Sequence, residues 1–168
     1  MTHKVGPRAL ALMHHFESCR LRAYLCSAKR ATIGWGMTYY PSGLRVKLGD
    51  TITRAEADAG FAHLLAHDFA PAVARAIGDA PTTPGQFGAM VALAYNIGTA
   101  AFAKSTVARL HRAGDHDGAA RAFASWNKER VKGVLKVSAG LVRRRAAEAA
   151  LYRGDYAALA EHTHGEVR

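Results

Sequence analysis

The sequence predicts an α+β fold in which a small antiparallel sheet lobe and a mainly helical lobe are joined by a long helix. Strand-forming and turn residues are concentrated between positions 20 and 50. From position 53 onward, helix-start signals are followed by apolar residues at helical spacing. The 168 residues, of which 49% are hydrophobic, suffice for one compact domain with a core and exclude a disordered chain.

The first element is a short amphipathic helix that opens at Pro7, where a missing N–H costs little. Leu10, Met13 and Phe16 recur on one face at helical spacing, and this face continues at Glu17, which ends the helix. The helix dipole disfavours an acid at this end, and the apolar stripe beside it partly desolvates the carboxyl group and favours its protonated form. We therefore take Glu17 as a candidate functional acid rather than an ordinary solvent-facing one.

A small antiparallel sheet of two or three short strands is expected between residues 20 and 50. The strand formers of this region are Tyr24, Thr32, Ile33, Trp35, Tyr39 and Tyr40. Turns are expected at Gly34, Gly36, residues 41–43 and residues 49–50.

The connecting helix is expected over about residues 53–78. Thr53 and Glu56 form a capping box at its start. Because Pro71 lacks a backbone N–H and clashes with the carbonyl group four residues earlier, we expect the helix to kink or restart near His67.

A helical lobe is expected over about residues 80–160. Thr83 and Gln86 form a second capping box, and the helix that they start is apolar nearly all round and ends at Gly98. This helix is expected to be the buried centre of the lobe. Further helices are expected at about 105–113, 116–126 and 141–153, residues 127–139 show no clear periodicity, and residues 155–168 are expected to form a short helix and a polar tail.

The charge of the chain limits its partners. A formal net charge of +10 and a pI of about 10.1 favour an acidic partner, which could be nucleic acid, anionic lipid or an anionic wall polymer. No apolar run approaches the roughly 20 residues of a membrane span, and residues 9–13 are too short for a usual signal-peptide core. We therefore expect the chain to stay in a cytoplasm unless something releases it. Two cysteines without CxxC spacing form neither a disulfide framework nor a zinc set, and no metal or cofactor is expected.

Three reactive side chains lie along the segment that leads from the first helix into the sheet. Eight residues separate Glu17 from Cys26, and five separate Cys26 from Thr32, which begins Thr-Ile-Gly-Trp-Gly at residues 32–36. This pattern resembles the signature of the phage-type lysozymes (glycoside hydrolase family 24), in which Glu, eight residues, Asp or Cys, five residues and Thr follow in order. The chain resembles in particular the lambdoid endolysin branch, which carries either Asp or Cys at the second position.

Further blocks resemble the family's connecting helix, core helix and C-terminal helices, and together they span roughly residues 8–153. They are Thr51-Ile52-Thr53 with Glu56-Ala57, Gln86-Phe87 with residues 94–98, Phe102 with Ser105-Thr106, residues 118–120, Trp126-Asn127, and Gly140-Leu141 with Arg144, Arg145 and Glu148. The resemblance implies a single lysozyme-like domain over residues 1–168, with a catalytic lobe over about 1–60, the connecting helix over about 53–78 and the helical lobe over about 80–160.

The resemblance also implies an activity and its setting. It implies an endolysin, a muramidase that hydrolyses the β-1,4 bond between N-acetylmuramic acid and N-acetylglucosamine in bacterial peptidoglycan and so lyses the host. The basic surface would then approach anionic outer-membrane or wall polymers rather than nucleic acid. The enzyme would be a monomer held in the host cytoplasm until a holin opens lesions to the periplasm and the wall.

Three residues are expected to carry the chemistry. Glu17 would be the general acid that protonates the leaving oxygen. Cys26 could act as a base, as a nucleophile or as a small buried filler, and the nearby cations Arg22, Lys29 and Arg30 favour its thiolate. Thr32 would hydrogen-bond the attacking water or the second group, unless it is simply a β-branched strand residue.

Four further residues are expected to bind substrate or support the acid. Tyr95, Asn96 and Ser105 would line the groove, although Tyr95 could instead belong to the core. Arg144 would be the cation near Glu17, and the alternative for it is a solvated basic helix face.

Two residues depart from the family pattern. Ser18 replaces the glycine that often follows the catalytic Glu, and Met37 replaces a His that in relatives pairs with an acid on the connecting helix. Asp68 stands at that acid's position, on the apolar stripe of the helix, and so needs another partner or must be exposed. In an oxidising space, Cys19 and Cys26 could form a disulfide that silences the site.

Other functions remain open at this point. A wall-lytic cysteine peptidase would need a Cys/His pair in a sheet-and-turn context that no His here occupies. A nucleic-acid-binding module is suggested by the net charge of +6 over residues 127–153 (eight Lys or Arg, two Glu), but no helix-turn-helix, zinc or RNA-recognition signature accompanies it. Membrane disruption by cationic helices could coexist with the enzyme.

Overall fold

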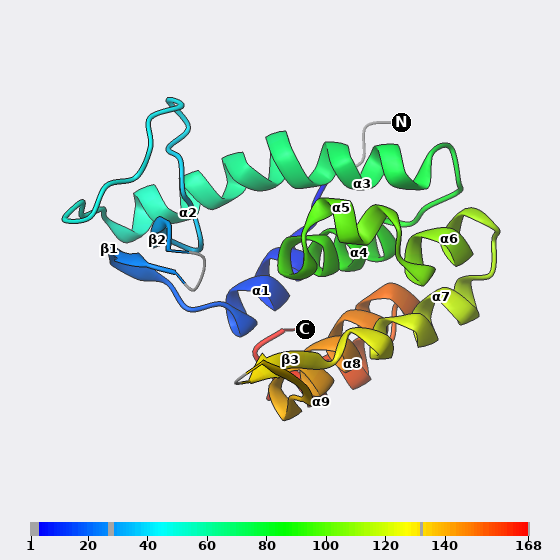
Figure 1. Ribbon diagram of the computed structural model, residues 1–168. Helices are drawn as coiled ribbons and strands as arrows, with labels where there is room; N and C mark the ends of the chain where they lie inside the picture. Colours follow the sequence, from blue (N-terminus) through cyan, green and yellow to red (C-terminus); the bar gives the residue numbers. More distant parts are fainter. Residues whose placement is uncertain (1–3, 27–28, 132, 168) are drawn as a thin grey trace.

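The computed structural model describes residues 4–26, 29–131 and 133–167, and it has the α+β architecture that the sequence predicts (Figure 1). The first lobe contains α1 (Pro7–Phe16), β1 (Arg20–Leu25) and β2 (Ala31–Gly34). The connecting segment consists of α2 (Arg54–Leu64), a π-helical turn η1 (Leu65–Phe69) and α3 (Ala70–Ile77). The helical lobe contains α4 (Pro84–Ile97), α5 (Thr99–Ala103), α6 (Thr106–Arg112), α7 (His116–Ala122), the 3-10 turn η2 (Phe123–Trp126), β3 (Lys128–Val131), β4 (Val134–Val137), α8 (Ala139–Arg153) and α9 (Tyr156–His162).

Helix α1 places Glu17 at its C-terminal cap, as expected. Pro7 occupies the first turn, Leu12 and Met13 are buried, and the backbone N–H of Glu17 donates to the carbonyl oxygen of Met13 over 3.0 Å. The extended backbone of Glu17 then turns the chain out of the helix toward β1. The carboxylate is therefore fixed to the end of a packed helix rather than to a loop.

The sheet of the first lobe is a two-stranded antiparallel hairpin. Tyr24 pairs with Thr32 and Leu25 with Ala31, and an irregularity in register lies between these pairs and Arg20. Isolated bridges extend the sheet beyond the named strands, one of them between Ile33 and Met37. The prediction of a small antiparallel sheet is confirmed.

The connecting segment forms one continuous helical rod, in which a π turn replaces the expected kink (Figure 1). Both hydrogen bonds of the Thr53–Glu56 capping box are present at its start. Pro71 cannot donate to the carbonyl group of His67, and the wide turn at Leu65–Phe69 accommodates this missing bond without breaking the rod. A π turn carries an extra residue, so it also rotates the following side chains relative to a regular α-helix.

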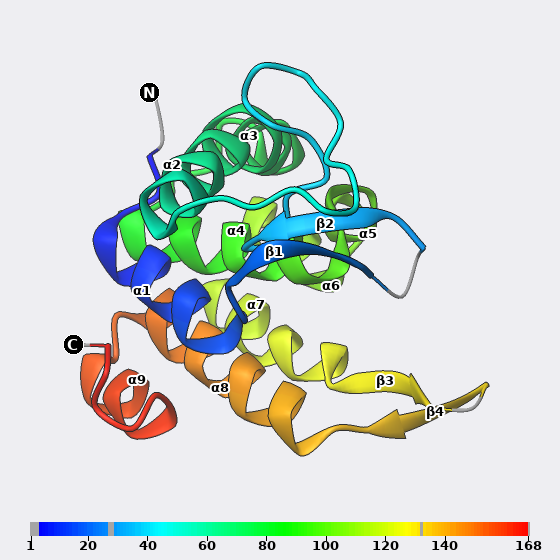
Figure 2. The ribbon, with the colours of Figure 1, turned by 90° about the vertical axis from the view of Figure 1, so that its left-hand side faces the viewer.

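Helix α4 is the buried centre of the helical lobe, as predicted. The Thr83–Gln86 capping box is formed, and every residue from Phe87 to Ala94 is buried. This helix packs against both α1 and α8, so the acid-bearing helix and the C-terminal helix share its support (Figure 2). Gly98 ends α4 with a φ of 91°, a conformation that favours glycine.

Residues 127–139, for which the sequence shows no clear periodicity and predicted no element, contain strands β3 and β4 of a second antiparallel hairpin. Figure 2 shows it extending beyond the ends of η2 and α8. All its described strand residues are exposed, so no apolar-polar alternation marks the strands in the sequence. The short helix α5 was also not predicted, whereas α6, α7 with η2, α8 and α9 lie within a few residues of the expected ranges. No helix of the described residues is long and apolar enough to cross a membrane.

Candidate active site

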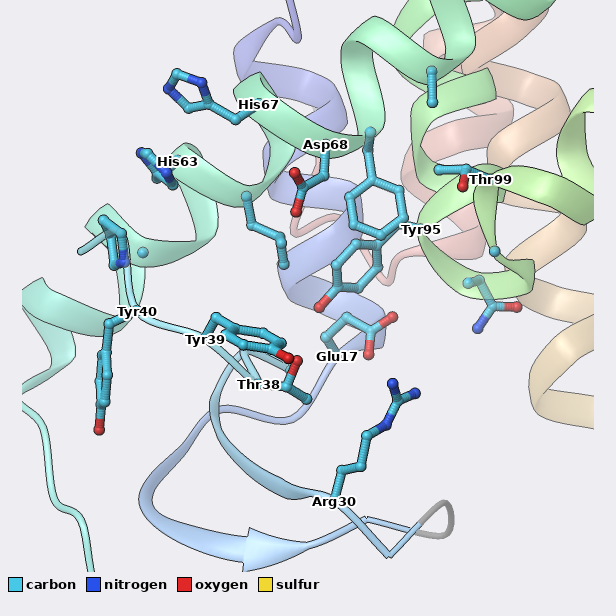
Figure 3. A pocket seen from close by; sticks show the side chains of 18 of the residues that line it. Glu17, Arg30, Thr38, Tyr39, Tyr40, His63, His67, Asp68, Tyr95 and Thr99 are labelled. Carbon is cyan, nitrogen blue, oxygen red and sulfur yellow. The ribbon is translucent and has the colours of Figure 1, made fainter. Parts of the chain in front are cut away.

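An open cleft of about 880 Å³ lies between the first lobe and the helical elements. Glu17 enters it from the end of α1, and Tyr95 enters it from the last turn of α4 (Figure 3). Asn96, the next residue of α4, also lines the cleft. The other walls are the loop after β2, with Thr38 and Tyr39, and one side of α2 and η1. The predicted residues Glu17, Tyr95 and Asn96 are thus brought together in one cleft.

Glu17 is bound to a buried cation. The guanidinium Nη1 of Arg144 donates to Glu17 Oε1 over 2.5 Å, across 127 positions of the sequence. The Arg144 side chain is 5% exposed and that of Glu17 is 24% exposed. Arg144 is therefore the predicted neighbour of the acid, and the alternative of a solvated basic face is wrong for this residue.

Arg144 belongs to a buried charge cluster that sequence reasoning missed. Its Nε donates to Oε1 of Glu148 over 3.1 Å, and Nη2 of Arg145 lies 3.1 Å from the same oxygen. Nη2 of Arg145 also donates to the side-chain oxygen of Asn96 over 2.9 Å and so holds that cleft amide in place. The i, i+4 spacing of Arg144 and Glu148 was the local signal that could have found the pair.

Burial and charge act against each other in this cluster. Burial alone would lower the pKa of Arg144, but the carboxylates of Glu148 and Glu17 raise it above its usual value. Burial raises the pKa of the Glu148 carboxyl, and the two guanidinium groups oppose that shift by stabilising the carboxylate. Because an arginine stays charged in proteins, two buried guanidinium groups require counter-charges, which Glu148 and Glu17 supply.

Tyr95 is held between the core and the cleft. Its hydroxyl donates to the backbone carbonyl oxygen of Trp35, and its ring contacts those of Phe61 and Phe69 at centroid distances of 5.3 and 5.1 Å. Burial raises the pKa of Tyr95, and the negative charge of Glu17 raises it further, so this phenol remains a hydrogen-bond donor. Tyr95 therefore both packs in the core and lines the cleft.

Trp35 links the sheet lobe to α2. Its indole N–H donates to Oδ1 of Asp58 over 2.7 Å, and its ring stacks on His14 at a centroid distance of 4.1 Å. Arg54 lies over the same ring and donates to Asp58 over 3.1 Å. Asp58 is a second supporting residue that was not predicted, because nothing in its local sequence marks the long-range contact with Trp35.

Cys26 and Thr32 meet at one backbone carbonyl group. The N–H of Cys26 and the hydroxyl of Thr32 each donate to the carbonyl oxygen of Arg30 over 3.0 Å. Thr32 is buried and Cys26 is half-buried. The structure thus brings together the two residues that the sequence pattern separates by five positions. Cys19 and Cys26 are not joined by a disulfide.

The structure corrects the expectation for Ser105 and decides between the alternatives for Asp68. Ser105 does not act as a groove residue in the structure, since it is buried and its hydroxyl caps α6 by accepting from the N–H of Ala108. Of the two alternatives for Asp68, a new partner or exposure, the structure shows exposure: Asp68 lies in the π turn, where the helical phase changes, and lines the cleft. Met37, at the position of the family's His, packs against Gly60 so closely that a Cβ there would lie 2.3 Å from its sulfur.

The described residues provide no group of side chains that could bind a metal ion. Among them, no group of three or more His, Cys, Asp or Glu side chains could hold a metal ion. The polar groups of the cleft next to the Glu17–Arg144 ion pair are the phenol of Tyr95 and the amide of Asn96, and a second carboxylate, that of Asp68, lines the cleft from η1. A carboxylate in an open cleft between a small sheet and a helical lobe is the arrangement of a lysozyme-type glycoside hydrolase.

Comparison with known proteins identifies the family. Residues 14–148 match the family described as phage lysozyme. The chain is 35% identical over 150 residues to an endolysin of Acyrthosiphon pisum secondary endosymbiont phage 1, a match that covers 88% of this chain and 97% of that protein. This chain belongs to the phage lysozyme family.

Solved structures agree with this assignment. The endolysin from Escherichia coli O157:H7 phage FAHEc1 superposes with a TM-score of 0.78 at 38% identity, covering 89% of this chain and 92% of that one. The muramidase domain of SpmX from Asticaccaulis excentricus superposes with a TM-score of 0.80 at 33% identity, covering 89% of this chain and 97% of that one. The lysozyme-like fold class predicted from the sequence is confirmed.

Proposed function

We propose that this phage lysozyme is an endolysin that hydrolyses the β-1,4 bond between N-acetylmuramic acid and N-acetylglucosamine in peptidoglycan. The observation that carries the proposal is the position of Glu17, which projects into the cleft from the end of a packed helix beside the buried cation Arg144. The endolysin and muramidase relatives support the same substrate.

Glu17 is the general acid of the proposed reaction. Its protonated carboxyl donates a proton to the leaving glycosidic oxygen as the bond to the anomeric carbon breaks. The ion pair with Arg144 then stabilises the carboxylate that this step leaves behind.

Cys26 and Thr32 form the second half of the proposed site. Cys26 acts either as a base that activates water or as a nucleophile that forms a covalent glycosyl intermediate. Thr32 fixes the backbone at Cys26 through the shared carbonyl group of Arg30, and its hydroxyl oxygen keeps lone pairs that can accept from a water. A filler role for Cys26 is the alternative that substitution tests.

Tyr95 and Asn96 position the polymer. Both side chains line the cleft next to Glu17, and each is held by a partner behind it, Tyr95 by the carbonyl group of Trp35 and Asn96 by Arg145. An aromatic ring and an amide held in this way suit the apolar face and the N-acetyl group of an amino sugar.

The cellular setting is proposed from the endolysin relationship and the charge. We infer a monomer of one domain that waits in the host cytoplasm, passes through holin lesions and uses its net charge of +10 to approach anionic wall and outer-membrane polymers. Host cells that express the chain with and without a holin test the release step. Lysis without any holin would contradict it.

Mass spectrometry of peptidoglycan digests tests the reaction. The proposal predicts fragments with reducing-end N-acetylmuramic acid. Anhydromuramic ends would indicate a transglycosylase, and cut peptides would indicate an amidase or a peptidase; either product would overturn the proposal.

A further inference from the structure

Glu148 is a buried carboxylate that the proposed chemistry does not use. It lies in the second half of α8, is 0% exposed and is not among the residues that line the cleft. Its Oε1 is 3.1 Å from Nε of Arg144 and 3.1 Å from Nη2 of Arg145. Each arginine also donates a hydrogen bond to a residue of the cleft, Arg144 to Glu17 and Arg145 to Asn96.

The four charges of this cluster balance one another. Arg144 and Arg145 are both buried and both remain positive, while Glu148 and Glu17 supply two carboxylates. If Glu148 were neutral, the two cations would act on Glu17 without an opposing charge. An opposite charge within about 4–6 Å stabilises an ionised carboxylate strongly, and this would remove the proton that a general acid must donate.

We propose that Glu148 is a positioning residue that divides Arg144 between two carboxylates and thereby limits how strongly Arg144 stabilises the carboxylate of Glu17. This inference rests on the proposed role of Glu17 as general acid. It assigns a function to a carboxylate that never touches the substrate. It also explains why a glutamate, costly to bury, lies behind the cleft.

Other charged and titratable groups face Glu17 from the surrounding elements. They are Tyr95 from α4, Arg30 from the connection before β2, Tyr39 from the loop after β2, and Asp68 from η1 (Figure 3). The charge-changing variants below substitute none of these groups and change only charges of the α8 cluster.

Two single variants test the proposal because they should shift the titration midpoint of Glu17 in opposite directions. Glu148→Gln keeps the side-chain shape but removes a negative charge, so the titration midpoint of Glu17, followed by carbon-13 NMR, should fall by about one pH unit. The alkaline limb of the pH profile of kcat/KM should fall with it. Arg145→Gln removes a positive charge and should raise both the titration midpoint of Glu17 and the alkaline limb of the pH profile.

A merely structural role for Glu148 gives a different result. It would lower stability and rate in both variants while leaving the midpoint of Glu17 unchanged or moving it in the same direction, and that outcome would overturn the proposal. Leu151→Ala is the matched control, since Leu151 is a buried, uncharged residue of the same helix and its truncation should lower Tm without moving the midpoint.

The test does not depend on one variant or on activity. If Glu148→Gln does not fold, the double variant Glu148→Gln/Arg145→Gln is measured instead. It removes one charge of each sign, so the titration midpoint of Glu17 should equal that of the wild type. Arg145→Gln alone still tests whether the midpoint rises. If the wild type releases no reducing-end sugar, the proposed function fails, but the NMR midpoints still test the coupling. If the enzyme is active and the midpoint of Glu17 is the same in the wild type and in both single variants, this inference is rejected while the proposed function stands.

Discussion

The backbone N–H of Cys26 and the side-chain hydroxyl of Thr32 donate to one carbonyl oxygen, that of Arg30, each over 3.0 Å. This shared acceptor closes the connection between β1 and β2. Through it, the backbone of Cys26 and the hydroxyl of Thr32 are held against the same carbonyl group, although the two residues come from opposite ends of the connection. Thr32 is therefore expected to matter for catalysis even without touching substrate.

Replacement of Thr32 tests this dependence. Thr32→Val keeps the shape but removes the donor, and loss of one hydrogen bond should cost about 1 kcal/mol of the free energy of unfolding. Displacement of Cys26 should lower the rate of peptidoglycan hydrolysis roughly 10-fold or more. Thr32→Ser restores the donor and should recover most of the rate. A Thr32→Val enzyme as fast as the wild type would show that the shared acceptor has no catalytic value.

Substitution of Cys26 distinguishes its three roles. Cys26→Ala should fold, because the residue is only half-buried, and should lose activity roughly 100-fold or more if the sulfur takes part in the reaction. Cys26→Asp should restore activity, since a carboxylate can serve as base. Unchanged activity of Cys26→Ala would mean that the residue is a filler.

The stereochemistry of the product separates base from nucleophile. A wild type that retains the anomeric configuration while Cys26→Asp inverts it would support a covalent intermediate at the sulfur. Wild-type inversion with no trapped adduct would rule out the nucleophile and leave the base. Proton NMR of the freshly released sugar ends reads the configuration before mutarotation.

Asp58 should make the fold sensitive to acid. Partial burial would raise the pKa of Asp58, but the hydrogen bonds from Trp35 and Arg54 outweigh it and hold the pKa below its usual value of 3.8. The carboxylate therefore adds stability that is present above about pH 4 and is lost as the pH falls through the lowered folded-state pKa. Asp58→Asn should show a smaller fall of Tm between pH 5 and pH 3 than the wild type. The exposed Asp79→Asn is the control, and an equal fall in all three proteins would contradict the assignment.

Gly36 should be required by Tyr95. Gly36 has a φ of 113°, and a Cβ there would lie 2.6 Å from the Tyr95 hydroxyl. Gly36→Ala should therefore lower the free energy of unfolding by about 1–3 kcal/mol and weaken the contact between Tyr95 and Trp35. Gly43→Ala is the matched control, because Gly43 has a φ of 83° but open space around its Cβ position. Equal Tm losses in the two variants would mean that the contact with Tyr95 adds nothing to the backbone strain.

The sequence predicted those elements whose structure depends on residues close together in the chain. Both capping boxes, the end of α1 at Glu17 and the buried α4 depend on residues within a few positions of one another, and all are present. The β3–β4 hairpin was missed because its strands bury neither face. The π turn could not be derived, since Pro71 forbids one hydrogen bond without specifying how the helix absorbs its loss.

The site was predictable where a family pattern marks it and not where backbone or distant groups complete it. The resemblance pointed to Glu17, Tyr95 and Asn96, which all line one cleft, and the position of Arg144 in the run of residues 143–145 pointed to it as the cation near the acid. The carbonyl group of Arg30 carries no signal in the sequence, because every residue has one. Ser105 was wrongly assigned to the groove because a serine directly before a helix is also an ordinary helix cap, and that is its role at the start of α6.

Quantitative muropeptide release by Glu17→Gln, measured beside the wild type by mass spectrometry, tests the central claim most directly. The variant keeps the shape and the hydrogen-bonding capacity of the side chain but cannot supply the proton, so release of reducing-end N-acetylmuramic acid should fall by roughly 100- to 10,000-fold with the fold intact. Glu161→Gln, at an exposed position on α9, should leave the rate unchanged. A Glu17→Gln protein that still releases reducing ends at the wild-type rate would contradict the account.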